Sequence, residues 1–411
     1  MRPFARALPL GLLLVLCALG TSGAFAAAAE RTVIVLSWDG LRHDYIDRLS
    51  LPGLERLARD GVRAGRLITV RPSDTFPSHV SLATGTYPDR HGIVGNLFVD
   101  RDLGAYHMSS DTRWLQAEPL WIAAERQGVI SATYFWVGSE QDWRGQRSRY
   151  RQTPFDSSRP EADKAAQIIA WLRLPAAQRP RLIMSYWRGA DSVGHRFGPA
   201  SKRVDQALAQ QDAVLQELLA ELDALNRWET LTLILVSDHG MVASGDYLPV
   251  REALRDADIE AQVVGQALAH VFLADPEQLP AAQAALEAVD PVLSVITGSA
   301  VPAHWRLQHP QRTGDLVLTV PPPYVLTMPT GFAGLVTRTL RWFGWDFGGH
   351  GYDPELPAMG AAFLAMGAGV EAGTELAQVR AVDVAATVSQ LLDIAPPAHS
   401  EGQPLRLQRQ P

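Results

Sequence analysis

Three short apolar runs constrain the fold of this 411-residue chain more than any other feature. They are Thr32–Trp38, Arg181–Trp187 and Leu231–Val236, and each is nearly free of charged residues. Runs of this kind are typical of parallel strands that are covered on both faces of a sheet. Helical patterns lie between them, at Glu161–Leu172 and most clearly at Ser201–Leu225, where leucines recur on one face. We therefore predict an α/β fold with a mostly parallel central sheet.

Residues 1–26 have the three parts of a cleaved secretory signal peptide. Two arginines come first, Leu8–Leu19 is the apolar stretch, and Ala-Phe-Ala at 24–26 is the cleavage pattern. The apolar stretch is too short for a comfortable membrane span, and an uncleaved N-terminal anchor is the alternative. Because the only cysteine is Cys17, the mature chain 27–411 would contain no thiolate ligand or nucleophile. We predict a periplasmic or secreted protein with no membrane contact beyond the signal.

The mature chain is predicted to form a single domain, because its length and its hydrophobic content suffice for one large core. Residues 246–346 have a different sequence pattern. We expect strands there at His270–Leu273 and Asp315–Val320 and a helix at Pro280–Val289. We interpret them as a small α+β insertion over the site. Loss of the two signal-peptide arginines takes the formal net charge from −7 to −9. This charge argues against a protein that binds nucleic-acid duplexes or anionic membranes.

A candidate nucleophile, Thr75, stands between a predicted strand and a predicted helix. Arg66–Val70 is the strand, and the helix has Pro77 in its first turn. A hydroxyl at such a junction lies where backbone N–H groups point at an anion. The alternative is that Thr75 only caps the helix, as threonine does routinely.

Side chains with oxygen or nitrogen donors recur at or just beyond the predicted strand ends. An Asp and a His four residues apart lie in the glycine-rich stretch Arg188–Pro199, which we expect to be irregular. Such donors suit Zn²⁺, and seven are too many for one tetrahedral ion but a natural number for two. Two ions about 4 Å apart stabilise the attacking and leaving oxygens of phosphoryl transfer. The candidate ligands are Asp39, Thr75, Asp191, His195, Asp238, His239 and His350.

At these positions the sequence resembles the nucleotide pyrophosphatase/phosphodiesterase family of the alkaline phosphatase superfamily. The resemblance extends over nearly the whole mature chain and implies a three-layer α/β/α sandwich. The histidines at 79 and 91 fall inside it, and we interpret both as structural. The matching motifs are LSWDGLRHDY (36–45), TFPSHVSLATGTYPDRHGI (75–93) with Asn96, FWVGSE (135–140), the segment 186–199, VSDHGM (236–241), HWRLQHPQRTGDLVL (304–318) and GGHGYDPELPAMGAAFLAMG (348–367).

The resemblance implies a role for each candidate residue in the hydrolysis of a phosphodiester or pyrophosphate bond in a small molecule such as a nucleotide. Thr75 would attack phosphorus and form a phospho-threonine intermediate. Asn96 would donate a hydrogen bond to a phosphate oxygen, and Tyr186 would stack on a nucleobase. Two Zn²⁺ ions are implied, one held by Asp191, His195 and His350 and the other by Asp39, Asp238 and His239 with the Thr75 hydroxyl alongside.

Other activities on the same scaffold stay open. A phosphomonoesterase would need cations for a dianionic phosphate, and Arg71, Arg188 and the arginines of 144–151 are the candidates. A choline-phosphodiester or phospholipase-C-like hydrolase would use aromatic residues, and those of 134–155 leave this open. A sulfatase is disfavoured because Thr75 cannot become formylglycine. A catalytically dead binding protein is disfavoured because no candidate ligand is missing.

Overall fold

The computed structural model describes residues 30–327, 339, 345 and 347–408, and Arg31–Pro411 forms one compact unit. The predicted signal peptide lies outside the described residues, as does part of the predicted insertion. The boundaries of the signal peptide, of the insertion and of the mature domain therefore stay predictions. None of the described helices has the length and apolar character needed to cross a membrane.

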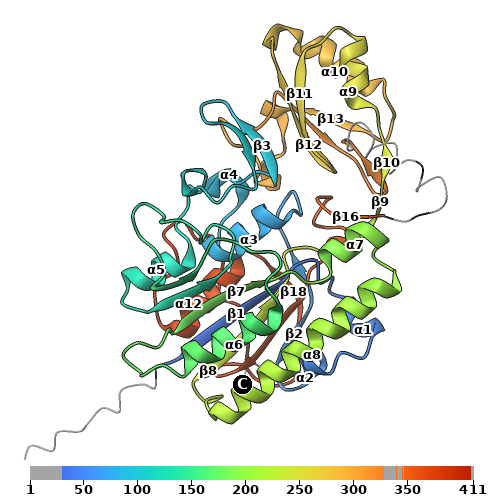
Figure 1. Ribbon diagram of the computed structural model, residues 1–411. Helices are drawn as coiled ribbons and strands as arrows, with labels where there is room; N and C mark the ends of the chain where they lie inside the picture. The colour runs from blue at the N-terminus through green and yellow to red at the C-terminus, as the bar shows by residue number, and fades with distance from the viewer. Residues whose placement is uncertain (1–29, 328–338, 340–344, 346, 409–411) are drawn as a thin grey trace, which may run out of the picture. The chain divides into compact units, whose positions relative to one another are not determined.

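An eight-stranded sheet forms the centre of this unit (Figure 1). Only β17 is antiparallel to its neighbours β2 and β8, and every other pairing in this sheet is parallel. This confirms the mostly parallel sheet. In spatial order the strands are β18 (Thr374–Arg380), β2 (Val62–Ile68), β17 (Phe363–Gly367), β8 (Leu231–Val236), β1 (Thr32–Trp38), β7 (Leu182–Trp187), β5 (Ser131–Tyr134) and β6 (Tyr150–Gln152).

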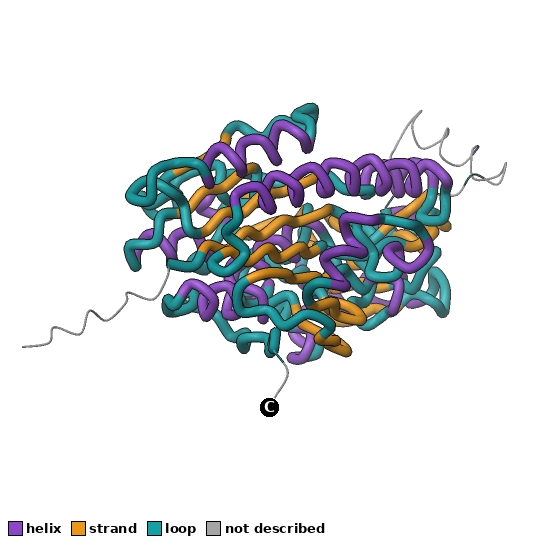
Figure 2. Tube along the Cα trace, turned by 90° about the horizontal axis from the view of Figure 1, so that it is seen from below, coloured by secondary structure: helices purple, strands orange, loops and turns teal. Residues whose placement is uncertain are grey.

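Helices cover both faces of this sheet, which confirms the three-layer sandwich (Figure 2). One layer contains α2 (Pro52–Arg59), α6 (Glu161–Leu172) and α8 (Lys202–Leu225). The other contains α3 (Thr75–Thr84), α5 (Leu120–Arg126) and α12 (Asp383–Leu392).

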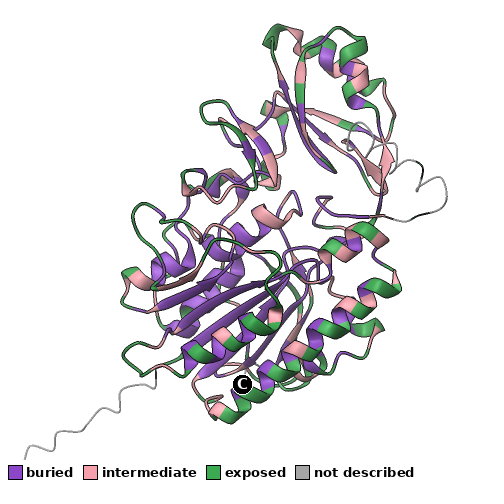
Figure 3. Ribbon diagram, in the orientation of Figure 1, coloured by how far each residue is buried: buried purple, intermediate pink, exposed green. Residues whose placement is uncertain are grey.

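Side-chain alternation along β1 explains why the apolar run is continuous. Ile34, Leu36 and Trp38 pack against the α2, α6 and α8 layer, whereas Val33 and Val35 pack against the opposite layer. All seven residues of β1 are buried, as the purple central strands of Figure 3 show. A strand that is apolar on both faces can lie only between two layers of helices.

The segment after β8 builds a second, smaller core around a four-stranded antiparallel sheet in the order β11-β12-β14-β13. Two short strand pairings lie next to this sheet in the sequence: β10 pairs with β15, and β16 pairs with β9. The elements are β9 (Val242–Ser244), β10 (Asp246–Tyr247), α9 (Val250–Asp256), β11 (Ala261–Gly265), β12 (Leu268–Leu273), α10 (Leu279–Glu287), β13 (Ser294–Thr297), β14 (Leu316–Thr319), β15 (Tyr324–Val325) and β16 (Phe347–Gly349).

Short elements complete the described chain. A hairpin of β3 and β4 follows the nucleophile segment and contributes Asp100, whose carboxylate forms a buried ion pair with Arg312. The short elements are α1 (Tyr45–Arg48), α4 (Pro88–His91), β3 (Leu97–Asp100), β4 (Gly104–His107), α7 (Asp191–Phe197) and the 3-10 turns Thr112–Trp114, Pro276–Gln278, Gly298–Ala300, Ala303–Trp305 and Pro357–Met359.

The glycine-rich stretch Arg188–Pro199 is not irregular, as the sequence suggested, because seven of its residues form α7. Gly194 serves close packing there, since a Cβ at this position would lie 2.3 Å from the sulfur of Met241. Two strands of the central sheet, β6 and β18, were not predicted. Both lie at the edges of the sheet, where one-sided contact leaves no continuous apolar run.

Candidate active site

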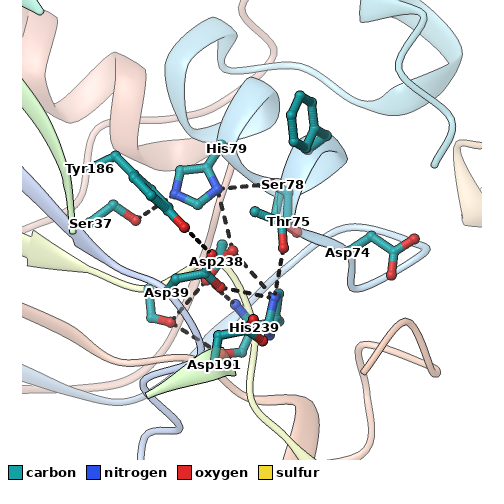
Figure 4. A network of polar contacts seen from close by, with 12 residues as sticks. Ser37, Asp39, Asp74, Thr75, Ser78, His79, Tyr186, Asp191, Asp238 and His239 are labelled. Atoms are coloured by element: carbon teal, nitrogen blue, oxygen red, sulfur yellow. Dashed lines mark hydrogen bonds and ion pairs between the residues drawn. The ribbon is translucent and has the colours of Figure 1, made fainter. Parts of the chain in front are cut away.

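The carboxyl ends of β1, β7 and β8 lie side by side because these strands pair in parallel, with Trp38 opposite Trp187 and Ser37 opposite Val236. The residues that follow β1 and β8 therefore meet at one edge. Nε2 of His239 lies 3.3 Å from Oδ1 of Asp39 and 3.3 Å from Oδ2 of Asp238 (Figure 4). The structure thus brings together the second predicted group of ligands.

The first predicted group comes from α7 and the loop after β16. Asp191 and His195 are one helical turn apart, and Nε2 of His195 lies 3.2 Å from Oδ1 of Asp191. Nε2 of His350 lies 3.7 Å from the same oxygen. Pairing of β16 with β9 brings His350 to this edge, and its ring stacks on that of His239 at 3.7 Å between centroids.

Thr75 is the first residue of α3, and its Oγ1 lies 3.2 Å from Nε2 of His239. The residue at the N-cap position is Asp74, so the capping alternative for Thr75 is wrong. Asn96 also lies at this helix start, where its Oδ1 accepts a hydrogen bond of 2.8 Å from the backbone N–H of Phe76. That bond orients the Asn96 amide beside the candidate nucleophile.

Unpaired carboxylate oxygens show that these side chains fit a bound metal. Among the described residues, Oδ1 of Asp39, Oδ1 of Asp191 and Oδ2 of Asp238 are buried and accept no hydrogen bond. Such oxygens are costly unless they are paired or coordinate a metal. Within the part of the chain that the structure describes, two groups have ligand atoms within 4.8 Å of one another: Asp191, His195 and His350, and Asp39, Asp191 and His239. The second group has Asp191 where the sequence suggested Asp238, because the Asp191 carboxylate lies between the two groups.

Burial and mutual repulsion perturb the pKa values of the three acids of this site. Burial raises the pKa of Asp39, and the charges of Asp238 and Asp191 raise it further. Burial also acts to raise the pKa of Asp191, but the neighbouring His195, with the charges of His350 and His239, brings it below its ordinary value. Burial acts to raise the pKa of Asp238 as well, but the charges of His239 and His79 and the N–H of Gly40 together lower it. The neighbouring negative charges therefore disfavour ionisation of Asp39, and a divalent cation would relieve this repulsion.

The histidines are perturbed in opposite directions. Burial lowers the pKa of His239 to about 4, so this imidazole is neutral and ready to bind a cation. Burial also acts to lower the pKa of His350, but the carboxylates of Asp74 and Asp191 raise it to about 9.

A layer of buried side chains supports the ligands. The Tyr186 hydroxyl donates a 2.6 Å hydrogen bond to Oδ2 of Asp39, and the Tyr186 side chain belongs to the core (Figure 4). Nε2 of His79 lies 2.7 Å from the Ser37 hydroxyl, and its Nδ1 lies 2.8 Å from the carbonyl oxygen of Thr75. His79 is thus a structural link, consistent with our interpretation, whereas the base-stacking role of Tyr186 stays a prediction.

Sequence reasoning missed Ser37, Asp74 and Phe155. Ser37 was visible as the one hydroxyl near the end of an apolar run. Phe155 lies in a loop with no periodic signal, and its ring packs edge-on against that of Tyr186 at 6.0 Å. No pattern in the sequence indicates that Asp74 contacts His350, because 276 residues separate them.

A family model described as type I phosphodiesterase/nucleotide pyrophosphatase matches residues 33–353. The chain belongs to this family. As a member of it, the protein is a hydrolase that acts on phosphodiester or pyrophosphate bonds. The predicted family is thereby confirmed.

Several relatives match most of the chain. An uncharacterized pyrophosphatase/phosphodiesterase of Schizosaccharomyces pombe is 30% identical over 89% of this chain and 77% of its own length. The bis(5'-adenosyl)-triphosphatase enpp4 of Xenopus laevis is 28% identical over 88% of this chain and 78% of its own length. The human ectonucleotide pyrophosphatase/phosphodiesterase family member 1 is 34% identical, but the match covers 51% of this chain and 23% of that protein.

Solved structures share the fold. Human ectonucleotide pyrophosphatase/phosphodiesterase 5 superposes with a TM-score of 0.82 at 24% identity, over 91% of this chain and 97% of the human one. The murine protein, as an inactive threonine-to-alanine variant in complex with AMP, superposes with a TM-score of 0.81 at 24% identity, over 89% of this chain and 96% of that one.

Proposed function

We propose that this phosphodiesterase is an exported, two-metal enzyme that cleaves nucleotides or similar diesters through a phospho-threonine intermediate on Thr75. The observation that carries the proposal is the position of the Thr75 hydroxyl, 3.2 Å from His239 at the start of a helix and beside three unpaired carboxylate oxygens. The predicted domain organisation and signal peptide 1–26 are part of the proposal, and mass spectrometry of the exported protein would test the signal by finding Ala27 at the N-terminus.

In the proposed first step, the Thr75 hydroxyl gives up its proton to solvent and Oγ1 forms a bond to phosphorus, while the bond from phosphorus to the leaving oxygen breaks and its electron pair departs with that oxygen. Asp191, His195 and His350 would hold one ion, and Asp39, Asp238 and His239 the other; we propose Zn²⁺ for both. Bound ions would supply Lewis-acid activation of the threonine hydroxyl and of the hydrolytic water. Asn96 would donate its amide N–H to a phosphate oxygen that gains charge. Water then cleaves the bond between phosphorus and Thr75, which returns the free hydroxyl.

Apolar side chains beside the site favour a nucleotide over a small polar diester. Phe155 is 43% exposed and packs against Tyr186, and Met108 is 52% exposed with its backbone N–H bonded to the carbonyl oxygen of Asn96. Single exposed apolar side chains are ordinary on protein surfaces, so what matters here is the position of these two next to Tyr186 and Asn96. A nucleobase would cover them. The relative that is named for cleavage of a bis-adenosyl triphosphate and the AMP complex of the murine neighbour support the same substrate class.

Three of the candidate cations for a monoesterase are already engaged. Arg71 forms an ion pair with Asp353 and lies over the Trp305 ring. Arg188 donates a 2.6 Å hydrogen bond to the carbonyl oxygen of Ser157. Among the arginines of 144–151, Arg151 pairs with Asp142. These contacts favour a diester substrate over a dianionic monoester.

Hydrolysis of three substrates tests the proposal: thymidine 5′-monophosphate p-nitrophenyl ester, bis-p-nitrophenyl phosphate and p-nitrophenyl phosphate. The zinc-loaded protein is expected to prefer both diesters by orders of magnitude, with turnover abolished in Thr75→Ala. Thr230→Ala removes the same hydroxyl at the amino end of β8 and is expected to leave rates unchanged. A faster monoester reaction, or an active Thr75→Ala variant, would contradict the proposal.

Phe155→Ala tests the substrate class separately. We expect a higher KM for the thymidine ester, by up to about tenfold as the loss of an aromatic contact of about 0.5–1.5 kcal/mol implies, with little change in kcat. An unchanged KM would remove Phe155 from the binding site.

A further inference from the structure

Asp74 occupies the N-cap position of α3 but does not cap it. An aspartate at this position usually accepts a hydrogen bond from an N–H of the first helical turn. Here its backbone is extended as in a cap, yet its side chain bonds to no N–H of the helix. The N–H of Phe76 is satisfied by Asn96 instead. The carboxylate of Asp74 is therefore available for another partner.

That partner is His350. Oδ1 of Asp74 lies 3.2 Å from Nδ1 of His350, on the side of the ring opposite to the nitrogen that faces Asp191. The Asp74 side chain is 22% exposed and the His350 side chain 7%, so water screens the contact only in part. Oδ2 of Asp74 lies 3.5 Å from the backbone N–H of Asn96, near the limit for a hydrogen bond. One carboxylate thus contacts both a metal-ligand candidate and the proposed phosphate donor.

The backbone next to His350 allows the contact between Asp74 and His350. Gly351 adopts φ +86°, and a Cβ there would lie 2.7 Å from Oδ1 of Asp74, so a larger residue would displace the carboxylate. The Gly351 N–H donates to the carbonyl oxygen of Ser73, which also lies 3.1 Å from Nδ1 of His350. A histidine that binds a metal is neutral and carries one ring proton. Because both acceptors face Nδ1 of His350, that proton lies on Nδ1 and leaves Nε2 free as a ligand atom.

We propose that Asp74 is a positioning residue that holds His350 in the orientation in which Nε2 faces Asp191 and thereby raises the affinity of one of the two metal positions. The inference rests on the proposed function in so far as it takes His350 to be a ligand. It assigns Asp74 a role that acts only through His350, and it predicts no effect on the position formed by Asp39, Asp238 and His239.

Zinc titration of the metal-free protein against a chromophoric chelator tests the proposal. Asp74→Ala is expected to raise one of the two dissociation constants for zinc by about 10- to 100-fold, which is the range for loss of a hydrogen-bond partner of a metal-bound histidine. We expect the lower end, because the Ser73 carbonyl oxygen remains as an acceptor. Asp74→Asn keeps an acceptor atom and is expected to fall between wild type and Asp74→Ala. Asp275→Ala removes an N-cap aspartate that does cap its turn and is expected to leave both constants unchanged.

A second measurement separates positioning from a general effect on structure. If Asp74 acts through His350, then Asp74→Ala causes no further loss of zinc affinity in a His350→Ala background. An additional loss there, or wild-type affinity in Asp74→Ala itself, would overturn the proposal. Diester hydrolysis is measured on the same samples. A wild-type protein that binds two ions but hydrolyses no diester would refute the proposed function, and the zinc constants would still decide the role of Asp74.

Discussion

Tyr186→Phe separates two roles of one side chain. The substitution removes only the hydroxyl, which donates the 2.6 Å hydrogen bond to Oδ2 of Asp39, and it keeps an aromatic ring for stacking. If Tyr186 serves only as a platform for a nucleobase, activity should survive. If its hydroxyl fixes Asp39, then metal affinity should fall.

The magnitude follows from the kind of bond that is lost. A hydrogen bond to a charged group contributes about 1.5–3 kcal/mol, and the partner oxygen is left buried and unpaired. At 1.4 kcal/mol per tenfold change, zinc affinity at the Asp39 position should fall by about 10- to 150-fold. Hydrolysis of nucleotide and non-nucleotide diesters should fall by the same factor at limiting zinc, and should recover largely at saturating zinc.

The assay is zinc competition combined with kinetics at several zinc concentrations. Tyr150→Phe is the matched control, because its hydroxyl donates a 2.9 Å hydrogen bond to a neutral carbonyl oxygen, that of Gln178. A Tyr186→Phe variant with wild-type zinc affinity would refute the reasoning. A loss confined to the thymidine ester would instead support the stacking role.

Further predictions concern stability and packing. Arg312→Ala should lower the free energy of unfolding by about 3–5 kcal/mol, because it leaves a buried carboxylate without its partner; Arg173→Ala, which breaks an exposed ion pair, should cost at most about 1 kcal/mol in the same urea titrations. Gly189→Ala should destabilise the protein more than Gly128→Ala, since both have positive φ but only the first would place a Cβ 1.9 Å from the backbone oxygen of Asp39. Equal losses within either pair would contradict the corresponding argument.

Strands buried on both faces were predictable because every residue in them had to be apolar. Thr32–Trp38 and Leu231–Val236 appear in the structure with the predicted bounds. Edge strands such as β18 escaped prediction, since only part of each is buried and its sequence resembles a loop. Composition also misled at α7, where glycine suggests a loop and the close approach of Met241, far along the chain, explains its presence.

The ligand candidates were predictable to a similar degree. Strand ends and the family motifs identified all of them, and parallel pairing explains why Asp39 and Asp238 meet. Contacts between side chains were not predictable. The bond from Tyr186 to Asp39 depends on side-chain direction, and the contact of Asp74 with His350 depends on how the chain returns from the insertion.

The two candidate metal positions differ in how the chain supplies their ligands. Asp39, Asp238 and His239 directly follow adjacent strands of the central sheet, and all three belong to the first 239 residues. His350 reaches the site only after the chain has built the smaller antiparallel sheet, through the short pairing of β16 with β9. A change in the length or stability of that segment would therefore loosen one ion while the other stayed bound. During synthesis, the first position would be complete more than one hundred residues before the second.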